Sequence, residues 1–316
     1  MRVGVVGVGA MGQHHARVYS ELSDDFGLEL VGIADKDLER AQELSDEYSY
    51  AAAYDDHKEL AEEGLDAVTI AVPTSLHKDI ALDFIEKGTD ILIEKPIADT
   101  VENAREILDA AGDNGVTIGV GHIERYNPAV QKLKKVIDDG VLGEVMSING
   151  TRVGPLAIRV RDVGIIIDLA VHEMDVISYL LDEMIQSVTA KAGNAKHPAD
   201  VEDYAQIMVD FDNGKTGVVE TNWLTPHKTR KLTVVGTKGI AYLDYIDQSL
   251  VLHTNDWEQS YKIEEREPLK NEIEDFLSSC RNGGEPCVTG EDGLHVLEAA
   301  QCAKESSQKN KKVKVA

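Results

Sequence analysis

The first 122 residues alternate short apolar runs with longer amphipathic segments. The apolar runs are rich in Val, Ile and Leu, which is typical of strands buried on both faces, and the segments between them repeat apolar residues at helical spacing. The predicted strands are residues 2–6, 29–34, 67–71, 90–93 and 116–120, and the predicted helices are residues 13–22, 37–47, 77–87 and 98–114. Strands that alternate with helices indicate a doubly wound parallel sheet, with its ligand at the carboxyl ends of the strands.

The pattern changes after residue 122, where apolar and polar residues alternate with a period of two. The predicted strands are residues 187–192, 204–211, 215–221, 230–235, 240–245, 249–253, 261–263 and 312–315, and the predicted helices are residues 129–138, 164–181, 269–281 and 292–306. Asp212-Asn213-Gly214 between two strands is a hairpin signal. This half reads as a large, mainly antiparallel sheet with helix 164–181 on one face.

We therefore predict an α/β chain of two domains. Residues 1–122 form the parallel-sheet domain, and residues 123–316 form an α+β domain. The second sheet needs a cover on the face that helix 164–181 leaves open, and such faces commonly meet another subunit. We expect a homo-oligomer, either a dimer or a tetramer.

Composition indicates an acidic folded protein. Lys and Arg number 32 against 57 Asp and Glu, so the formal charge is −25, which disfavours nonspecific binding to nucleic acid or to an anionic membrane. We expect no signal peptide, and no segment approaches the roughly 20 apolar residues that span a bilayer. Cys280, Cys287 and Cys302 form no close-spaced metal pattern, and free thiols are their expected state. We expect a soluble, cytoplasmic protein.

A glycine-rich turn follows the first predicted strand. Gly7, Gly9 and Gly12 stand in the order Gly-x-Gly-x-x-Gly, with Ala10 and Met11 before the last glycine, and a predicted helix follows directly. A strand, such a turn and a helix N-terminus together form a binding site for the pyrophosphate of a dinucleotide.

Asp35 ends the second predicted strand, at the interval where a carboxylate accepts hydrogen bonds from adenosine ribose hydroxyls. An acid there disfavours a 2′-phosphate, so NAD is the expected cofactor, although the adjacent Lys36 keeps NADP open as an alternative. The alternative is a glycine-rich turn without a ligand and an Asp that is only solvated. It explains less well why a strand, a turn, a helix, a second strand and an acid occur together in this order.

Polar residues also follow the later strands of the first domain. Thr74 comes after strand 67–71, and Glu94-Lys95-Pro96 comes after strand 90–93. An isolated lysine is usually a solvated surface residue. Lys95 differs because it leaves the end of a central strand beside Pro96, where the chain can be held in a fixed turn and the peptide bond can be cis.

The predicted helix 164–181 is mostly apolar but carries ionisable residues. Asp168 and His172 are four residues apart and Asp175 lies three further on, so their side chains share one face of an α-helix. Buried ionisable groups are costly unless they are paired or used. We interpret Asp168 and His172 as active-site residues, with a self-satisfied polar pair as the structural alternative. A metal site is a further alternative, but zinc usually recruits more His or Cys, so we expect no metal.

The combination resembles the glucose-fructose oxidoreductase and inositol dehydrogenase (GFO/IDH/MocA) family of NAD(P)-dependent oxidoreductases. The matching features are Gly7-x-Gly9-x-x-Gly12 with His15-Ala16 beyond it, Asp35, Pro73-Thr74 with His77, Glu94-Lys95-Pro96, Arg125-Tyr126-Asn127-Pro128, Asp168-x-x-x-His172, and the C-terminal Pro268-Leu269, Glu272, Phe276 and Thr289-Gly290-Glu291-Asp292-Gly293. The resemblance implies a Rossmann domain before an open-sheet domain, with the active site in the cleft between them.

The resemblance also implies roles for single residues. It makes Lys95 and His172 the catalytic pair, with Asp168 beside them. The implied cofactor contacts are Gly7, Gly9, Ala10, Met11, Gly12, Asp35, Pro73, Thr74, His77, Glu94, Lys95 and Pro96. Chemistry agrees, because oxidation of a secondary alcohol needs a base for the hydroxyl proton, and a neutral His suits that task. A cationic Lys would stabilise alkoxide character on the reacting oxygen, and the two roles can be exchanged.

The arginines suggest an anionic substrate. Four of the eleven, Arg125, Arg152, Arg159 and Arg161, fall within 37 residues, and Tyr126 adjoins the first. Arg binds phosphate and carboxylate bidentately, whereas pairing with surface acids is the alternative. Residues 151–164 also resemble the nucleotide-sugar branch of the family, which includes UDP-N-acetylglucosamine 3-dehydrogenases.

We therefore expect a small-molecule substrate, a UDP-sugar oxidised at a ring hydroxyl, with the 3-hydroxyl as first candidate. An inositol or neutral-sugar dehydrogenase is one alternative. A non-catalytic member of the family that senses cofactor or sugar is another.

Overall fold

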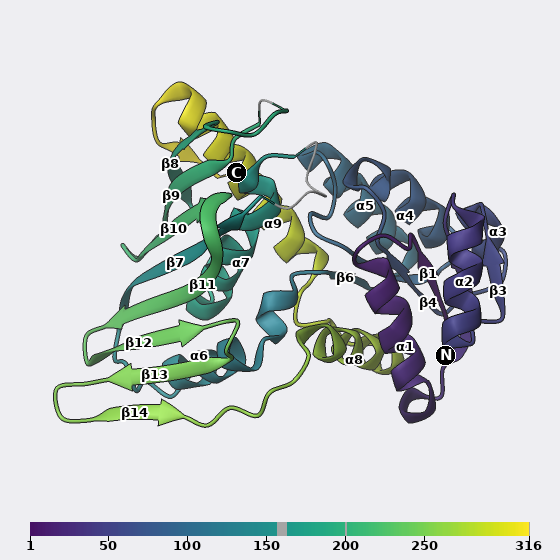
Figure 1. Ribbon diagram of the computed structural model, residues 1–316, viewed down its shortest axis with the longest axis horizontal. Helices are drawn as coiled ribbons and strands as arrows, with labels where there is room; N and C mark the ends of the chain where they lie inside the picture. Colours follow the sequence, from purple (N-terminus) through teal and green to yellow (C-terminus); the bar gives the residue numbers. More distant parts are fainter. Residues whose placement is uncertain (157–162, 200, 316) are drawn as a thin grey trace. The chain divides into compact units, whose positions relative to one another are not determined.

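A computed structural model describes the whole chain apart from residues 157–162, 200 and 316. The chain folds as two compact units (Figure 1). Unit 1 comprises Met1–Ile123 and Glu267–Leu294, and unit 2 comprises Glu124–Arg266 and His295–Ala316. The predicted boundary near residue 122 agrees with the point where the chain first passes from unit 1 to unit 2, between Ile123 and Glu124. The prediction that residues 123–316 form a single domain is wrong for residues 267–294, which belong to unit 1.

Unit 1 is built on a six-stranded sheet in the order β3-β2-β1-β4-β5-β6, with all neighbours parallel. The strands are β1 (Arg2–Val6), β2 (Glu29–Ala34), β3 (Ala52–Tyr54), β4 (Ala67–Ile70), β5 (Asp90–Ile93) and β6 (Ile118–Val120). The helices are α1 (Gly12–Phe26), α2 (Leu38–Tyr48), α3 (His57–Ala61), the 3-10 turn η1 (Thr74–Leu76), α4 (His77–Ile85), α5 (Val101–Asn114), α8 (Pro268–Asn282) and the start of α9 (Gly290–Lys309). This strand order is the Rossmann arrangement, so the predicted doubly wound sheet is confirmed.

Helix α8 completes the core of unit 1. On the α8 side the buried residues are Leu269, Ile273, Phe276 and Leu277, and on the α1 side they are Val18, Tyr19 and Leu22. Full burial of a Leu or Phe side chain stabilises by about 1.5–3 kcal/mol. This apolar contact is the physical reason that residues 267–294 fold with unit 1, and an amphipathic pattern alone does not say which sheet a helix covers.

Unit 2 is built on a nine-stranded sheet in the order β14-β13-β12-β11-β7-β10-β9-β8-β15. The strands are β7 (Val145–Pro155), β8 (Ser187–Gly193), β9 (Tyr204–Asp210), β10 (Thr216–Asn222), β11 (Leu224–Gly236), β12 (Gly239–Asp244), β13 (Ser249–His253), β14 (Glu258–Tyr261) and β15 (Val313–Lys314). The helical segments are η2 (Ile123–Tyr126), α6 (Pro128–Asp138), η3 (Ile166–Ala170), α7 (Val171–Leu181) and the remainder of α9. Among the described strands of unit 2, only β7 and β10 pair in parallel, so the mainly antiparallel sheet is confirmed.

Strand β7 lies at the centre of this sheet, between β10 and β11, and the sequence pattern does not predict it. Its inward-facing positions include Gly150 and Arg152 rather than only apolar residues. A Cβ at Gly150 would lie 2.7 Å from Oε2 of Glu173, so the glycine makes room for a buried carboxylate. Apolar and polar residues therefore do not alternate regularly around Gly150 and Arg152, and this is why the pattern does not predict β7.

The predicted helix 164–181 consists of two segments. Ile166–Ala170 forms the π-helical turn η3, in which the N–H of Val171 donates to the carbonyl of Ile166, five residues earlier. Helix α7 follows and packs on β7 and β10, as predicted for one face of the sheet. A Cβ at Gly217 of β10 would lie 3.0 Å from Ile177, which shows how close the helix comes. The prediction that Asp168 and His172 share regular α-helical spacing is wrong, because Asp168 lies in the π turn.

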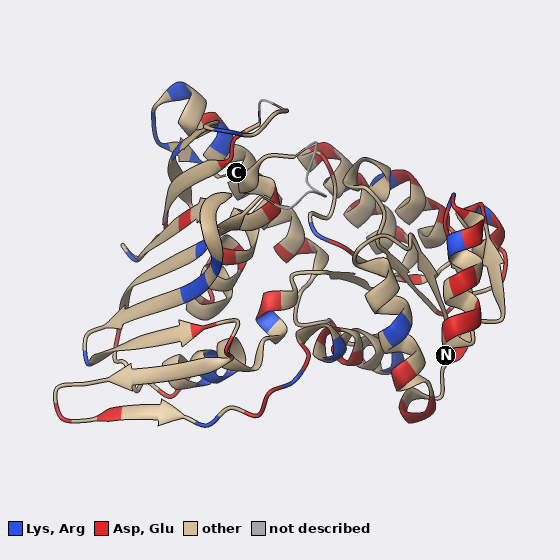
Figure 2. Ribbon diagram, in the orientation of Figure 1, with Lys and Arg blue, Asp and Glu red and all other residues tan. Residues whose placement is uncertain are grey.

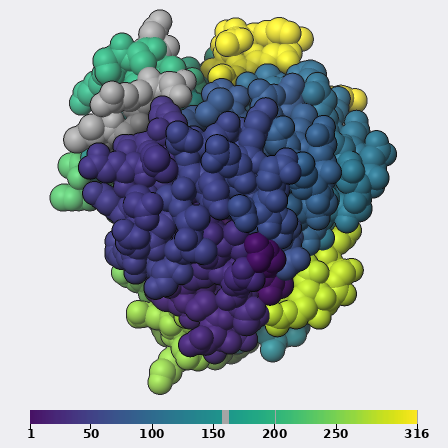
Figure 3. Space-filling model, turned by 90° about the vertical axis from the view of Figure 1, so that its right-hand side faces the viewer, coloured from purple at the N-terminus to yellow at the C-terminus, as the bar shows by residue number. Residues whose placement is uncertain are grey.

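Acidic residues lie on the exposed face of α2 in unit 1. The α2 ribbon in Figure 2 shows this, and its exposed acids are Glu39, Glu43, Asp46 and Glu47. In the space-filling view, the N-terminal segments, purple to blue, form a continuous outer surface of unit 1 (Figure 3). Among the helices that the structure describes, none is long and apolar enough to cross a membrane.

Candidate active site

The glycine-rich turn between β1 and α1 needs glycine at two positions for steric reasons. Gly7 has a φ of 90°, and a Cβ there would lie 2.5 Å from the carbonyl oxygen of Ala71. A Cβ at Gly12 would lie 1.8 Å from the carbonyl oxygen of Gly7. A Cβ at Gly9 would instead point into space that the described residues leave open. The two outer glycines thus build the turn, while Gly9 allows a ligand to approach the backbone.

The exposed part of this turn fits a dinucleotide. Gly9 and Ala10 are exposed and Met11 is half-buried, directly before the N-terminus of α1. The first turn of α1 reads Gly-Gln-His-His, so the positive end of the helix dipole remains available to an anion.

Asp35 lies beside the same turn. Its Oδ2 accepts a hydrogen bond from the Val8 N–H at 2.7 Å, and its Oδ1 accepts from the Asp37 N–H at 2.9 Å. The carboxylate is half-buried at the carboxyl end of β2. It therefore holds the turn and stands where the adenosine ribose of a dinucleotide is expected.

Lys95 leaves the carboxyl end of β5, and its side chain is half-buried. The Lys95–Pro96 peptide bond is cis, as the sequence allowed. Oε2 of Glu94 accepts a hydrogen bond from the Lys95 N–H at 3.2 Å. The backbone at Lys95 is therefore fixed by its immediate neighbours.

His77 is buried beneath this region. Its Nδ1 lies 3.0 Å from the carbonyl of Pro96, and its Nε2 lies 3.0 Å from the carbonyl of Val72. Burial lowers the pKa of His77, in spite of these acceptors. The ring therefore lies between the chain after β4 and the chain after β5, and the expectation that His77 contacts the cofactor stays a prediction. Pro73 is exposed and Thr74 half-buried in that same connection.

In unit 2, Asp168 lies in the π turn η3 and His172 lies in the first turn of α7. Both are half-buried, whereas Glu173 and Asp175 on α7 are 0% and 1% exposed. A π turn inside a helix is common at functional sites. The helix thus presents Asp168 and His172 partly to solvent while its other ionisable residues are held inside.

Two arginines hold those buried carboxylates. Arg125 binds Asp175 through Nε and Nη2, with distances of 2.6–3.0 Å. Arg152 binds Oε1 of Glu173 through Nε at 2.7 Å. Such charge-assisted bonds fix the orientation of the helix that carries His172.

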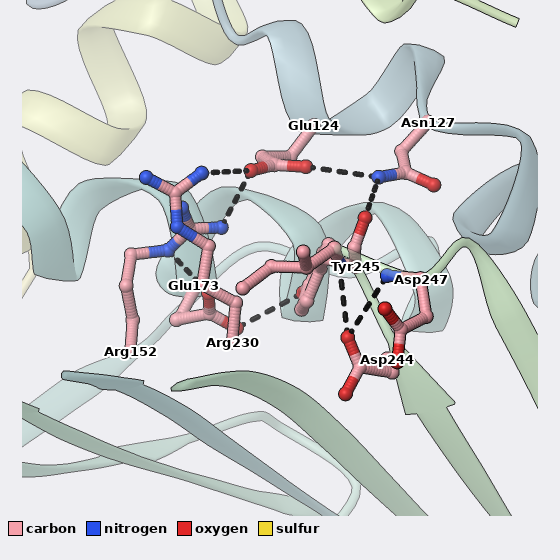
Figure 4. A network of polar contacts seen from close by, with 9 residues as sticks. Glu124, Asn127, Arg152, Glu173, Arg230, Asp244, Tyr245 and Asp247 are labelled. Carbon is pink, nitrogen blue, oxygen red and sulfur yellow. Dashed lines mark hydrogen bonds and ion pairs between the residues drawn. The ribbon is translucent and has the colours of Figure 1, made fainter. Parts of the chain in front are cut away.

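The Arg152 pair extends into a network (Figure 4). Nη2 of Arg152 donates to Oε1 of Glu124 at 2.8 Å, and the Tyr245 hydroxyl donates to Oε2 of Glu173 at 2.9 Å. Burial raises the pKa of Glu173 although Arg152 opposes the shift, while the carboxylates outweigh burial and raise the pKa of Arg152. Nη1 of Arg230 lies 3.5 Å from Oε1 of Glu124.

This network bears on the expectation for the substrate-binding residues. Arg125, Tyr126 and Arg152 are 4%, 3% and 2% exposed, and both guanidinium groups are bound by carboxylates of the protein. Arg125 and Arg152 therefore hold carboxylates of unit 2, and the contact of these residues with a substrate stays a prediction. Arg159 and Arg161 lie outside the described residues. Across the described parts of the chain, His, Cys, Asp and Glu do not gather into groups that would hold a metal ion.

Sequence reasoning missed several residues that position the site. Glu173 directly follows His172 in an apolar helix, so it could have been recognised as a buried acid that needs a cation. Glu124 and Arg230 have no such local signal, because the strands and turns that bring them to Arg152 are far apart in the sequence.

Comparison with known proteins agrees with this geometry. Residues 1–122 match the GFO/IDH/MocA oxidoreductase family, NAD-binding Rossmann fold, and residues 130–242 match the GFO/IDH/MocA C-terminal domain. The chain is 30% identical to the inositol 2-dehydrogenase of Rhizobium meliloti, over 100% of this chain and 99% of that protein.

Solved structures share the whole fold. A UDP-N-acetylglucosamine 3-dehydrogenase from Acidithiobacillus ferrooxidans is 27% identical, covers 98% of both chains and superposes with a TM-score of 0.89. A levoglucosan dehydrogenase in complex with NADH and levoglucosan is 25% identical, covers 100% of this chain and 99% of its own, and has a TM-score of 0.91. Both domains, the glycine-rich turn and these relatives lead to one conclusion: the chain is an NAD-dependent oxidoreductase of the GFO/IDH/MocA family.

Proposed function

We propose that this enzyme transfers hydride between a secondary ring hydroxyl of a sugar or polyol and the nicotinamide of NAD. The observation that carries the proposal is the half-buried pair Asp168 and His172, presented from a π turn and a helix whose other acids are locked by arginines. An imidazole and a carboxylate held on so rigid a support suit proton transfer to and from a hydroxyl.

In the oxidative direction His172 would accept the hydroxyl proton, and NAD, held at the glycine-rich turn and Asp35, would supply the hydride acceptor. Lys95, as an ammonium, donates a hydrogen bond to the reacting oxygen and stabilises its developing negative charge. Asp168 orients the imidazole or a substrate hydroxyl. In the reverse direction the proton returns from His172 to the carbonyl oxygen.

Substitution of the two residues tests these roles. Lys95→Met and His172→Asn should each lower kcat by about 10²-fold or more, the usual contribution of a positioned acid, base or oxyanion donor. NADH formation followed at 340 nm measures the rate, and fluorescence titration measures NADH binding, which should persist. Lys58→Met and His253→Asn are matched controls, since these side chains are 67% and 43% exposed. Wild-type rates in either catalytic variant would refute the assignment.

For the substrate, we propose first a nucleotide sugar such as UDP-N-acetylglucosamine, oxidised at its 3-position. The 27% identical structure of a UDP-N-acetylglucosamine 3-dehydrogenase supports it. Arg230 adds a candidate contact, because its side chain is 35% exposed whereas that of Arg152 is 2% exposed.

The second candidate is an inositol or another neutral ring polyol. The 30% identical inositol 2-dehydrogenase supports it, and so does the pairing of the buried Arg125 and Arg152 with carboxylates of the protein.

One comparison separates the two candidates. Thermal-shift and steady-state assays with UDP-N-acetylglucosamine and with myo-inositol, each with NAD and NADP, identify the ligand that raises stability and is turned over. Arg230→Gln should raise KM for the nucleotide sugar by about tenfold, the loss of one charge-assisted bond, without changing KM for inositol. Lys231→Gln on the same strand is the control, with a side chain 63% exposed. Turnover of inositol without turnover of any UDP-sugar would refute the first candidate.

We also propose that unit 2 forms a homo-oligomer through the sheet face opposite α7. Ala205, Ile207 and Val209 of β9 face the core, so alternate residues such as Met208 point to the other face. The large apolar residues exposed there are Tyr204, Met208, Val218 and Tyr242. Such a row favours burial against a second copy. Light scattering should give a dimer or tetramer, Met208→Lys should weaken it, and a wild-type monomer at micromolar concentration would refute the proposal.

The cysteines support a cytoplasmic location, which we propose as well. Cys280, Cys287 and Cys302 are free thiols, the usual state in a reducing compartment. Cell fractionation with a tagged protein tests this location, and recovery outside the cytoplasmic fraction would contradict it.

A further inference from the structure

A fully buried histidine lies next to the Lys95 region, and the proposed chemistry does not use it. His15 is in the first turn of α1 and is 0% exposed. Its Nε2 lies 3.0 Å from Oε1 of Glu94, whose side chain is 12% exposed. The pair therefore joins the helix that begins at the cofactor turn to the residue directly before Lys95.

The other side of the His15 ring is also held. Nδ1 makes a long contact of 3.5 Å to Oγ1 of Thr69 on β4, and Thr69 Oγ1 lies 2.9 Å from the Tyr19 hydroxyl. Both partners are 0% exposed. The ring is thus fixed at both nitrogen atoms, and its Nε2 is directed at Glu94.

Glu94 passes this constraint on to Lys95. While Oε1 contacts His15, Oε2 accepts the hydrogen bond from the Lys95 N–H at 3.2 Å. Gly121 leaves space for the carboxylate, because a Cβ there would lie 3.1 Å from Oε2. Burial would raise the pKa of Glu94, but the hydrogen bond from His15 and the charges of His15 and Lys95 outweigh it and lower the pKa. The carboxylate is therefore ionised at neutral pH and is a strong acceptor.

A buried contact between a histidine and a carboxylate adds little net stability, because desolvation of the carboxylate offsets the gain from the hydrogen bond. Such a contact mainly fixes the orientation of its two side chains. We propose that His15 is a positioning residue that holds Lys95 in place through Glu94. The inference rests on the proposed role of Lys95, whose ammonium must meet the reacting oxygen.

The test uses replacements that differ in one hydrogen bond. His15→Gln can keep a donor near the Nε2 position, whereas His15→Met removes it and keeps an apolar side chain. His14 is the matched control, since it is the adjacent histidine on α1 and is exposed. Glu94→Gln removes the charge of the acceptor.

Two measurements read the position of Lys95. His15→Met should lower kcat by about tenfold or more, because a displacement near 1 Å of a catalytic group can cost about 10²-fold, while the Kd for NADH changes less than about threefold. Competitive acetylation followed by mass spectrometry should show faster modification of Lys95 relative to the exposed Lys36. His15→Gln should restore most of both properties, and His14→Met should change neither. In the Glu94→Gln background, His15→Met should have little further effect, because both residues act through one contact.

Unchanged Lys95 acetylation in His15→Met, or multiplicative losses in the double variant, would overturn the inference. An equal loss in His15→Gln and His15→Met, with NADH binding lost as well, would also overturn it, since that indicates general disruption of unit 1. The acetylation measurement needs no sugar. It therefore decides the inference even if no tested sugar is a substrate and the proposed function fails.

Discussion

Removal of the Arg152 side chain should strongly destabilise unit 2. Arg152 is 2% exposed, and it is bound to Glu173 at 2.7 Å and to Glu124 at 2.8 Å. Arg152→Met leaves two carboxylates buried, with Glu173 at 0% and Glu124 at 6% exposure. Removing one partner of a buried ion pair costs about 3–5 kcal/mol, because the remaining charge is desolvated without compensation.

The assay follows from the composition of the chain. Its two tryptophans, Trp223 and Trp257, both lie in unit 2, so tryptophan fluorescence during urea unfolding reports this unit selectively. With an m-value of about 3 kcal/mol/M, the expected loss lowers the urea midpoint by roughly 1–1.7 M. Lys231→Met is the control on the neighbouring strand, where the cation is 63% exposed and lies 3.7 Å from Asp244. Such a surface pair contributes about 0–1 kcal/mol.

The pH dependence of this loss has a definite sign. Burial already raises the pKa of Glu173, and removal of Arg152 raises it further. When the pKa of a carboxyl group is higher in the folded than in the unfolded state, the free energy of unfolding falls as pH rises from the unfolded pKa, about 4.3 for Glu, through the folded pKa. The penalty of Arg152→Met should therefore grow from pH 5 toward neutrality. Replacement of both Arg152 and Glu173 by apolar residues should recover part of it. A loss below about 1 kcal/mol at pH 7, or a loss that shrinks as pH rises, would refute this account of the network.

Three further predictions concern unit 1 and the thiols. Gly12→Ala should disrupt the turn and abolish NADH binding, because its Cβ would lie 1.8 Å from a carbonyl oxygen. Gly9→Ala should weaken NADH binding in fluorescence titration and leave the thermal unfolding midpoint unchanged. Equal thermal stability of the two variants would contradict this difference between the two glycines. Asp35→Ala should weaken NADH binding about tenfold and reduce the preference for NAD over NADP, since the carboxylate both holds the turn and disfavours a 2′-phosphate. An unchanged preference for NAD over NADP would argue against a contact between Asp35 and the ribose. Burial raises the pKa of the Cys280 thiol, helped by Asp90, and burial and neighbouring acids also raise that of Cys302. Iodoacetamide at pH 8, read by peptide mapping, should therefore label both slowly in the native protein and rapidly in urea, and fast native labelling of Cys280 would be inconsistent with its burial.

Local patterns predicted the parts of the fold that depend on local physics. Strand β5 is a run of apolar residues between a helix cap and a proline, and its bounds agree with the prediction. The glycine-rich turn was found because the steric demand at Gly7 and Gly12 leaves one residue type. Lys95 could be singled out as a candidate because its strand end and Pro96 are adjacent in sequence.

Features that depend on distant partners were missed or misplaced. Strand β7 was missed because Gly150 and Arg152 occupy its inward positions, and their reason is Glu173 on another element. The ion pairs of Arg125 and Arg152 could not be predicted from the sequence, because the acids that bind them, Asp175 and Glu173, come from α7. A pattern of charges along the chain does not show which charges meet after folding.

The return of α8 to unit 1 has a consequence for how the chain is made. A ribosome releases the N-terminal part first, and domains generally fold as they emerge. Phe276 and Leu277, which pack against α1, are synthesised only after every strand from β7 to β14. The core of unit 1 therefore keeps its α1 side uncovered until these strands of unit 2 have been synthesised. The unit whose synthesis begins first receives its last core helix only after most of the chain has been made.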